Sequence, residues 1–273
     1  MSANFYPVQF LAERVGGRNA SVTGLTPPGT EPHDLALSGP ALQQLRSSDV
    51  VLYLGASFQP DIEKAVTELP KDALAVDLLG VPGLDLLNPP AGDPGAHEGA
   101  TAAKDPHVWL DPVRMKLLAR ATADAMAAAD RPGAAAYEAN LKELLAELDA
   151  LDSDLRQQLG HCTRNTLLTS HAAFGYLATR YGLEQIAIAG ISPDDEPDAK
   201  TLANISEAAS SAGVEAVFFE EQLNPALAKT VAGSIGAETR TLSPVEFDPG
   251  GGQDYFTLMR ENAAQIGKGL GCQ

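Results

Sequence analysis

The chain has 273 residues, of which 44% are hydrophobic, and its formal net charge at pH 7 is −17. The length suggests one large domain or two small ones, and the hydrophobic content is too high for a disordered chain. The negative charge argues against nucleic acid as a partner, because binding to phosphates requires a basic face.

The first part of the chain alternates between strand-like and helix-like segments. A first strand is predicted to end at residues 4–6, and further strands are predicted at 20–25, 49–55 and 75–79. Helices are predicted between them at 8–15, 38–47 and 60–69. Because strands alternate with helices over short connections, this pattern predicts a parallel, right-handed α/β sheet.

The middle of the chain contains a long loop and then two helices. Residues 80–104 are rich in Gly, Pro and Ala, and a loop this long inside a compact domain is expected to be functional or mobile. Asp111-Pro112 is typical of a helix start, and that helix should end before the Arg131-Pro-Gly133 break. A second helix is predicted over 133–159, about 40 Å long at about 1.5 Å per residue. Its leucines at 141, 144, 148, 151 and 155 predict one buried stripe.

The second half repeats the alternation. Strands are predicted at 166–169, 185–191, 216–219 and 239–242, and helices at 172–181, 200–212, 225–235 and 255–270. The expected fold class is therefore α/β, with two lobes, each a mostly parallel sheet flanked by helices, joined by one long linker helix. We expect an N-terminal lobe at residues 1–131, the linker helix at 132–160 and a C-terminal lobe at 161–273.

Three of the five histidines, His33, His107 and His171, occupy predicted loop-to-helix edges. His171 follows a short apolar run that predicts a buried strand, and Ser170 before it is a suitable helix N-cap. This edge of an open α/β sheet binds ligands, and imidazole suits zinc, copper, iron or nickel. We therefore hypothesise that the three histidines meet at one metal ion. The alternative is that each caps a helix or binds a backbone carbonyl.

The other two histidines and the known catalytic motifs give weaker indications. His161, at a predicted helix end, is expected to be structural, since a cation there favours the helix dipole. His97 lies in the 80–104 loop, where it could shuttle metal but where a solvated side chain is the simpler interpretation. The sequence contains no HExxH, GxSxG, GxGxxG or GxxxxGK[ST] motif, so no local pattern indicates a zinc protease, a serine hydrolase or a nucleotide-binding loop.

The two cysteines, Cys162 and Cys272, are far apart in the sequence and belong to no CxxC pair, which argues against a cysteine zinc site. We predict a disulfide between them, because a free thiol at the penultimate residue would be unusual. The alternative is two unrelated thiols. For a loop of over a hundred residues, chain entropy gives a stabilisation of about 4–5 kcal/mol, and the bridge would imply an oxidising compartment.

Four sequence blocks carry a family resemblance. They are Phe5-Tyr-Pro7, the block from Gly24 to Asp34 that ends in Pro-His-Asp, Asp105-Pro-His-Val-Trp-Leu-Asp-Pro112, and Thr169-Ser-His-Ala-Ala-Phe-Gly-Tyr176. In this order they resemble the zinc/manganese solute-binding proteins of ABC transporters, the cluster A-I family. Residues 190–193, 218–220 and 255–262 add further blocks, so the resemblance covers nearly the whole chain.

The resemblance implies two α/β lobes joined by one long helix, with a metal ion bound between the lobes. The family's first three ligand positions match His33 and His107 in one lobe and His171 in the other. Histidine instead of a carboxylate at the third position resembles the zinc type of the family. Zn²⁺ is therefore the expected ligand, and Mn²⁺ is less favoured.

The chain departs from the family pattern in two places. The family's fourth ligand, an Asp in a Leu-Asp-Pro block, is replaced here by Ser243. Water, Glu220, Glu246 or Asp248 could take its place. The family often has a histidine-rich loop, but residues 80–104 keep only His97, so we expect no large metal-collecting role for this loop.

The function implied by the resemblance is capture of Zn²⁺ and its delivery to an ABC-transporter permease for import, without bond chemistry. Such a protein is extracytoplasmic, in the periplasm or at the outer face of the cell membrane with or without a lipid anchor, and we expect a monomer. No apolar run approaches 18 residues, so we expect no transmembrane helix. The first seven residues lack the basic and apolar segments of a signal peptide, so we expect a chain that begins after a removed signal.

Two alternatives belong to other functional classes. Three histidines with an open position could serve a zinc-dependent hydrolase, which would need a general base such as Glu220. Metal could instead stabilise an adhesin-like protein, and its removal would then unfold the chain.

Overall fold

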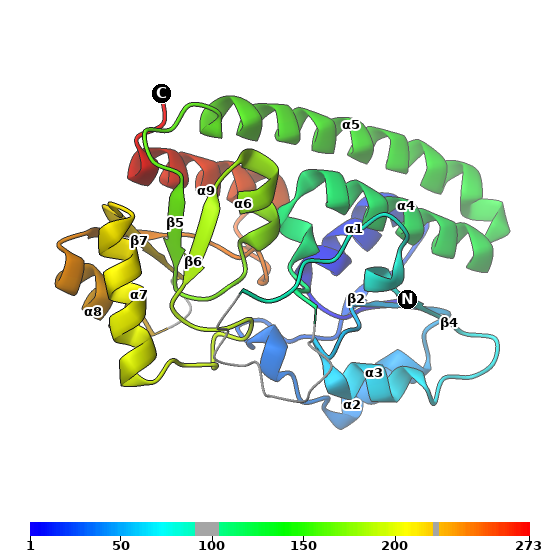
Figure 1. Ribbon diagram of the computed structural model, residues 1–273. Coiled ribbons are helices and arrows are strands. Elements are labelled where there is room, and N and C mark those ends of the chain that lie inside the picture. Colours follow the sequence, from blue (N-terminus) through cyan, green and yellow to red (C-terminus); the bar gives the residue numbers. More distant parts are fainter. Residues whose placement is uncertain (91–103, 221–223) are drawn as a thin grey trace. The chain divides into compact units, whose positions relative to one another are not determined.

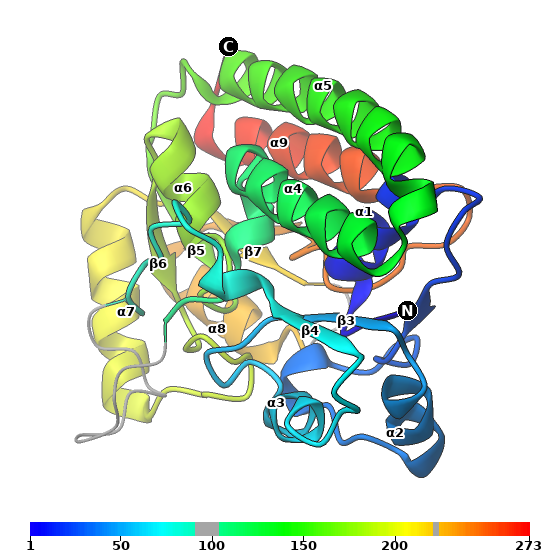
Figure 2. The same ribbon diagram turned by 90° about the vertical axis from the view of Figure 1, so that its right-hand side faces the viewer.

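The computed structural model describes residues 1–90, 104–220 and 224–273, and Figures 1 and 2 show it in two views. The chain divides into two compact units. Unit 1 contains Met1–Leu86, Pro112–Ala150 and Val245–Tyr255, and unit 2 contains Leu87–Asp111, Leu151–Pro244 and Phe256–Gln273. His97 and most of the predicted 80–104 loop lie outside the described residues. Within the described parts, no helix combines the length and the apolar character needed to cross a membrane.

Unit 1 is built on a parallel sheet with the strand order β2-β1-β3-β4. The strands are β1 (Ser2–Ala3), β2 (Thr23–Gly24), β3 (Val50–Tyr53) and β4 (Leu74–Asp77). The helices are α1 (Tyr6–Gly16), α2 (Gly39–Arg46), α3 (Pro60–Val66) and α4 (Pro112–Ala129). Helices α2 and α3 cover one face of the sheet, and α1 and α4 cover the other (Figure 2). Because both faces are covered, strand β3 is apolar throughout, as parallel strands usually are.

Unit 2 repeats this plan with the parallel strand order β6-β5-β7-β8. The strands are β5 (Thr166–Thr169), β6 (Glu184–Ala187), β7 (Ala216–Phe219) and β8 (Glu238–Thr241). The helices are α6 (Gly175–Tyr181), α7 (Ala199–Ser211), α8 (Ala226–Ile235) and α9 (Tyr255–Leu270). Helices α7 and α8 pack on one face over Leu168 and Val217, while α6 and α9 cover the other face (Figure 1).

Helix α5 (Ala134–Leu159) follows the predicted break at residues 131–133 and runs from unit 1 into unit 2. Its leucine stripe is buried, as the helical spacing predicts. In unit 2, Arg180 of α6 donates to both carboxylate oxygens of Asp152 of α5, at 2.9 and 2.6 Å. Burial acts to raise the pKa of Asp152, but the hydrogen bonds and charge of Arg180 bring it below its usual value. The predicted architecture of two parallel α/β lobes with a long helix between them is confirmed.

Several predicted boundaries differ from the structure: the strand expected at 20–25 is Thr23–Gly24, and the strand expected at 185–191 is Glu184–Ala187. Two further differences have an identifiable local cause. Residues 4–6 do not end the first strand, because α1 begins at Tyr6 with Pro7 in its first turn, where a missing N–H has no cost. Ser170 does not cap a helix. Helix α6 begins only at Gly175, and Phe174 at its N-cap makes no side-chain hydrogen bond to it. The hydroxyl of Ser170 instead donates to Oε1 of Glu220, at 2.7 Å.

The predicted disulfide between Cys162 and Cys272 is present in unit 2. It lies in a short antiparallel pairing of the chain after α5 with the chain after α9. There the N–H of Thr163 donates to the carbonyl of Gly271, at 3.3 Å, and the N–H of Gln273 donates to that of His161, at 3.1 Å. We call this pairing the terminal clip. The exposed His161 lies within it and takes part in the pairing through its backbone carbonyl.

Candidate metal centre

Two of the three predicted histidine ligands lie together in unit 2. His107 comes just before the 3₁₀ turn Val108–Leu110, and His171 comes just after β5. Both side chains are fully buried, and their ring centroids are 5.4 Å apart. The sequence suggested that His107 belongs with His33, whereas the structure puts it beside His171 in unit 2.

The segment that carries His107 is fixed within unit 2 by two long-range hydrogen bonds. The Tyr176 hydroxyl of α6 donates to the carbonyl of Asp105, at 2.7 Å. The indole N–H of Trp109 donates to the carbonyl of Pro244, also at 2.7 Å. Because both side chains are buried, these bonds hold the segment firmly, which explains why this part of the chain joins unit 2.

Each of these two imidazoles is paired with a buried carboxylate through its Nδ1 atom. Oδ1 of Asp105 lies 2.8 Å from Nδ1 of His107 and accepts the His107 backbone N–H at 2.9 Å. Oε1 of Glu220 lies 2.5 Å from Nδ1 of His171. An ionised carboxylate can only accept, so such a partner favours the tautomer with the proton on Nδ1 and the lone pair on Nε2. That is the tautomer in which an imidazole binds a metal through Nε2.

The third histidine lies in unit 1 with a carboxylate of its own. His33 belongs to the 3₁₀ turn Pro32–Asp34, in the loop after β2, and its Nε2 is 3.8 Å from Oε1 of Glu246. The side chains of both residues are largely or completely buried. Unit 1 therefore holds one imidazole beside one carboxylate, both of which are groups that bind zinc.

The turn that carries His33 is supported by the loop after β3. The Gln59 side-chain amide donates to the carbonyl of Pro32, at 3.0 Å, and to the hydroxyl of Thr26, at 3.1 Å. The ring of Phe58 meets the His33 imidazole edge-on, with centroids 4.7 Å apart. The two residues before Phe58 and Gln59 are Ala56 and Ser57, which have positive φ angles of 58° and 64°. This conformation is costly for residues other than glycine.

The chain segment that leads to Glu246 is also held in place. Asn262 of α9 clamps Ser243, because its amide accepts the Ser243 N–H at 2.8 Å and donates to the Ser243 carbonyl at 2.6 Å. The chain passes from unit 2 to unit 1 between Pro244 and Val245. Val245 is buried and has a φ of 61°, which is rare for a β-branched residue. This turn of the backbone presents the carboxylate of Glu246 next in the chain.

The structure separates the candidates for a fourth ligand. Glu246 lies beside His33, Glu220 lies against Nδ1 of His171, and Asp248 is exposed and accepts the N–H of Gly250 at 2.9 Å. The sequence gave no role to Asp105, although the Asp-Pro-His spacing was visible, because only the folded turn shows that this carboxylate reaches Nδ1 of His107.

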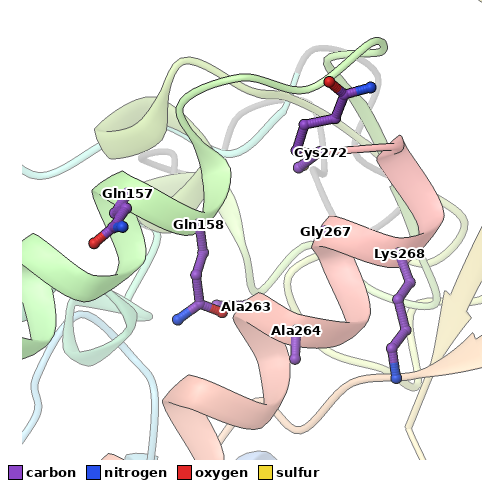
Figure 3. A pocket seen from close by; sticks show the side chains of 8 residues that line it. Gln157, Gln158, Ala263, Ala264, Gly267, Lys268 and Cys272 are labelled. Atoms are coloured by element: carbon purple, nitrogen blue, oxygen red, sulfur yellow. The ribbon is translucent and has the colours of Figure 1, made fainter.

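A separate groove of about 390 Å³ lies in unit 2 between the ends of α5 and α9 (Figure 3). Its polar lining includes Gln157, Gln158 and Lys268, and Cys272 of the disulfide lies at its edge. None of the candidate metal ligands lines it. The groove is therefore lined mainly by α5 and α9 and is separate from the candidate metal ligands.

The sequence matches the family described as ZnuA, zinc-uptake complex component A, periplasmic, over residues 2–269. This chain belongs to that family. It is 34% identical over 274 residues to the zinc-binding protein AdcA of Streptococcus pyogenes serotype M6, a match that covers 94% of this chain and 53% of AdcA. The chain thus spans about half the length of the AdcA relatives that it matches. The resemblance predicted from the four sequence blocks is confirmed.

Two further comparisons agree with this membership of the ZnuA family. The high-affinity zinc uptake system protein ZnuA of Bacillus subtilis (strain 168) is 32% identical, over 94% of this chain and 83% of that protein. The solved structure of the Zn(II)-bound ZnuA-like domain of Streptococcus pneumoniae AdcA matches with a TM-score of 0.81 and 31% identity. That match covers 98% of this chain and 97% of the other.

Proposed function

We propose that this chain captures one Zn²⁺ ion with four side chains, two from each unit, and delivers it to an ABC permease for import. His33 and Glu246 bind from unit 1, and His107 and His171 bind from unit 2, each through one ligand atom. The observation that supports this most directly is that each unit of a ZnuA-family chain holds a buried pair of metal-ligand side chains.

The chemistry of the four groups favours zinc. Zinc is usually bound by four protein ligands in a tetrahedron, and imidazole and carboxylate are among its common ligands. Three imidazoles are softer donors than the carboxylates and carbonyls that suit manganese, so we propose that the protein prefers Zn²⁺ to Mn²⁺. Two relatives described as zinc-binding or zinc-uptake proteins support the same choice.

A ligand set divided between two units also supports transport instead of catalysis. A relative movement of the units would separate the two pairs and release the ion to the permease, without any bond chemistry. Glu220, the candidate general base of a hydrolase, is already bound to His171 and Ser170. We propose an extracytoplasmic monomer, in agreement with the periplasmic description of the family.

A competition titration against a chromophoric zinc chelator tests the proposal on metal-stripped protein. The variants are His33→Ala, His107→Ala, His171→Ala and Glu246→Gln. Zinc sites in small peptides have binding free energies of about 10–16 kcal/mol, so the loss of one of four ligands should cost on the order of 3 kcal/mol. That corresponds to a rise of roughly 100-fold in Kd for each variant.

The matched control is His161→Ala, which removes an exposed histidine of the terminal clip and should leave the zinc Kd unchanged. An undiminished zinc affinity of His171→Ala would overturn the proposed site. The zinc-loaded protein should also fail to turn over model esters and phosphate esters. Steady turnover abolished by Glu220→Gln would favour a hydrolase instead.

A further inference from the structure

The imidazole of His171 is held by a buried glutamate from a neighbouring strand. Strands β5 and β7 are paired in parallel, with Thr169 opposite Phe218. Ser170 and His171 therefore leave β5 at the same sheet edge where Glu220 leaves β7. The N–H of Ser170 continues the pairing by donating to the carbonyl of Phe218, at 2.8 Å. The sheet register itself thus brings Glu220 to His171.

One oxygen of this glutamate accepts two hydrogen bonds. Oε1 of Glu220 lies 2.7 Å from the Ser170 hydroxyl, which donates to it, and 2.5 Å from Nδ1 of His171. The Glu220 residue is 1% exposed and His171 is fully buried, so the bond between them is shielded from water, whereas Ser170 is only partly buried. Burial of the Glu220–His171 pair strengthens the bond between them and makes its geometry more specific.

The backbone of His171 is fixed independently of its side chain. The Thr169 hydroxyl donates to the His171 carbonyl, at 2.7 Å. The Gln185 amide donates to the same carbonyl, at 3.1 Å, and to the Thr169 hydroxyl, at 2.7 Å. With its main chain held in this way, His171 can still rotate its ring and change its tautomer. The contact of Glu220 with Nδ1 restricts both.

We propose that Glu220 is a positioning residue that holds His171 in the tautomer with its lone pair on Nε2, and that Glu220 does not bind the ion itself. The inference rests on the proposed zinc function. Carboxylates that hydrogen-bond a metal-binding histidine fix its orientation and raise its basicity, and their loss typically costs about 10–100-fold in metal affinity. The Asp105 contact to Nδ1 of His107 has the same form, at 2.8 Å.

The alternative is that Glu220 ligates the metal through its other oxygen. Within the described residues, Oε2 of Glu220 is buried without a hydrogen-bond partner. The test must therefore separate a ligand from a positioning residue. The variants that do so are Glu220→Ala, Glu220→Gln and Ser170→Ala, because a glutamine can still accept the Nδ1 proton whereas an alanine cannot.

The first measurement is the tautomer of His171 in the full-length, metal-stripped protein at one fixed pH, from the ¹⁵N shifts of its ring. Glu220→Gln should keep the proton on Nδ1, and Glu220→Ala should show a mixture of both neutral tautomers. This readout uses no zinc, so its failure is distinguishable from a failure of the proposed function. An Nδ1 proton that persists in Glu220→Ala would overturn the inference.

The second measurement is the zinc Kd of the same variants. Glu220→Ala should weaken binding by about 10–100-fold, Glu220→Gln by less, and Ser170→Ala by the least. If Glu220→Gln instead loses as much affinity as His171→Ala while keeping the tautomer, Glu220 is a ligand and the inference is wrong. Glu215→Gln is the matched control, because this exposed glutamate precedes the same strand and should change neither quantity. If Glu220→Ala does not fold, Glu220→Gln still separates the two outcomes.

Discussion

Val245 is a buried β-branched residue with a positive φ, and it stands immediately before a proposed zinc ligand. The left-handed conformation costs an L-residue about 1–2 kcal/mol, and residues held this way often cluster at functional sites. Ser243 and Pro244 are anchored in unit 2 by Asn262 and Trp109, so the turn at Val245 is what carries the chain to Glu246. The strain therefore has an identifiable structural purpose.

The strain at Val245 predicts that its glycine and alanine variants differ in stability in the opposite sense to the same two variants in a helix. Val245→Gly should be at least as stable as Val245→Ala, and more stable by up to about 1 kcal/mol, because glycine adopts a positive φ without a steric cost. The free energy of unfolding from denaturant titrations measures the difference. Both variants lose the valine side chain, so their comparison isolates the backbone.

The control for this comparison is Val231, a fully buried valine in the interior of α8. At that position the glycine variant should be less stable than the alanine variant by about 1 kcal/mol, as in any helix. If Val245 shows the same order as Val231, the backbone at Val245 is not strained.

At the residue scale, the sequence predicted three histidines as metal ligands but left the fourth ligand open. Ser243 in place of the family's aspartate was visible, and Glu246 was one of several nearby carboxylates. Choosing among them depends on the positive φ of Val245 and on the contact of Glu220 with His171, and neither leaves a pattern in the sequence. Local propensity cannot predict a strained backbone, because tertiary contacts hold it in place.

Helix α9 is tied to the end of α5 by the terminal clip and its disulfide. The two cysteines are 110 positions apart, so the bridge closes a long loop in the unfolded chain. We expect the Cys162→Ser/Cys272→Ser variant to lose up to about 5 kcal/mol of unfolding free energy relative to the oxidised protein, because the unfolded chain regains its freedom.

Equilibrium unfolding with and without a reductant tests the contribution of the disulfide. Reductant should lower the midpoint of the wild-type protein to near that of the double serine variant, which should itself be insensitive to reductant. Equal midpoints for the oxidised protein and the variant would contradict a stabilising role for the bridge.

At the element scale, the order and type of the main helices and strands followed from hydrophobic periodicity and from Gly and Pro positions. The leucine stripe of α5 and the break before it are confirmed because their spacing and their proline act locally. The start of α6 could not be predicted in this way. Ser170 has a good capping side chain, but the buried carboxylate of Glu220 binds it instead, and the helix begins five residues later.

At the scale of the whole molecule, the chain consists of two α/β units of the same plan in a ZnuA-family protein. The boundaries predicted from sequence, after residues 131 and 160, follow chain order and stay a prediction. The placement of His107 with His171 could not be derived from chain order, because it depends on long-range bonds from Tyr176 and Trp109. Each unit then supplies two of the four proposed ligands.

The central claim is that one zinc ion is held by both pairs at once. Anomalous scattering at the zinc edge from crystals of the zinc-loaded protein tests it most directly. We predict one zinc peak per chain, at about 2.0–2.1 Å from a nitrogen of His33, His107 and His171 and at about 2.0–2.2 Å from an oxygen of Glu246. A zinc ion bound by the pair of one unit alone, or coordinated by Glu220 or Asp248, would contradict the account.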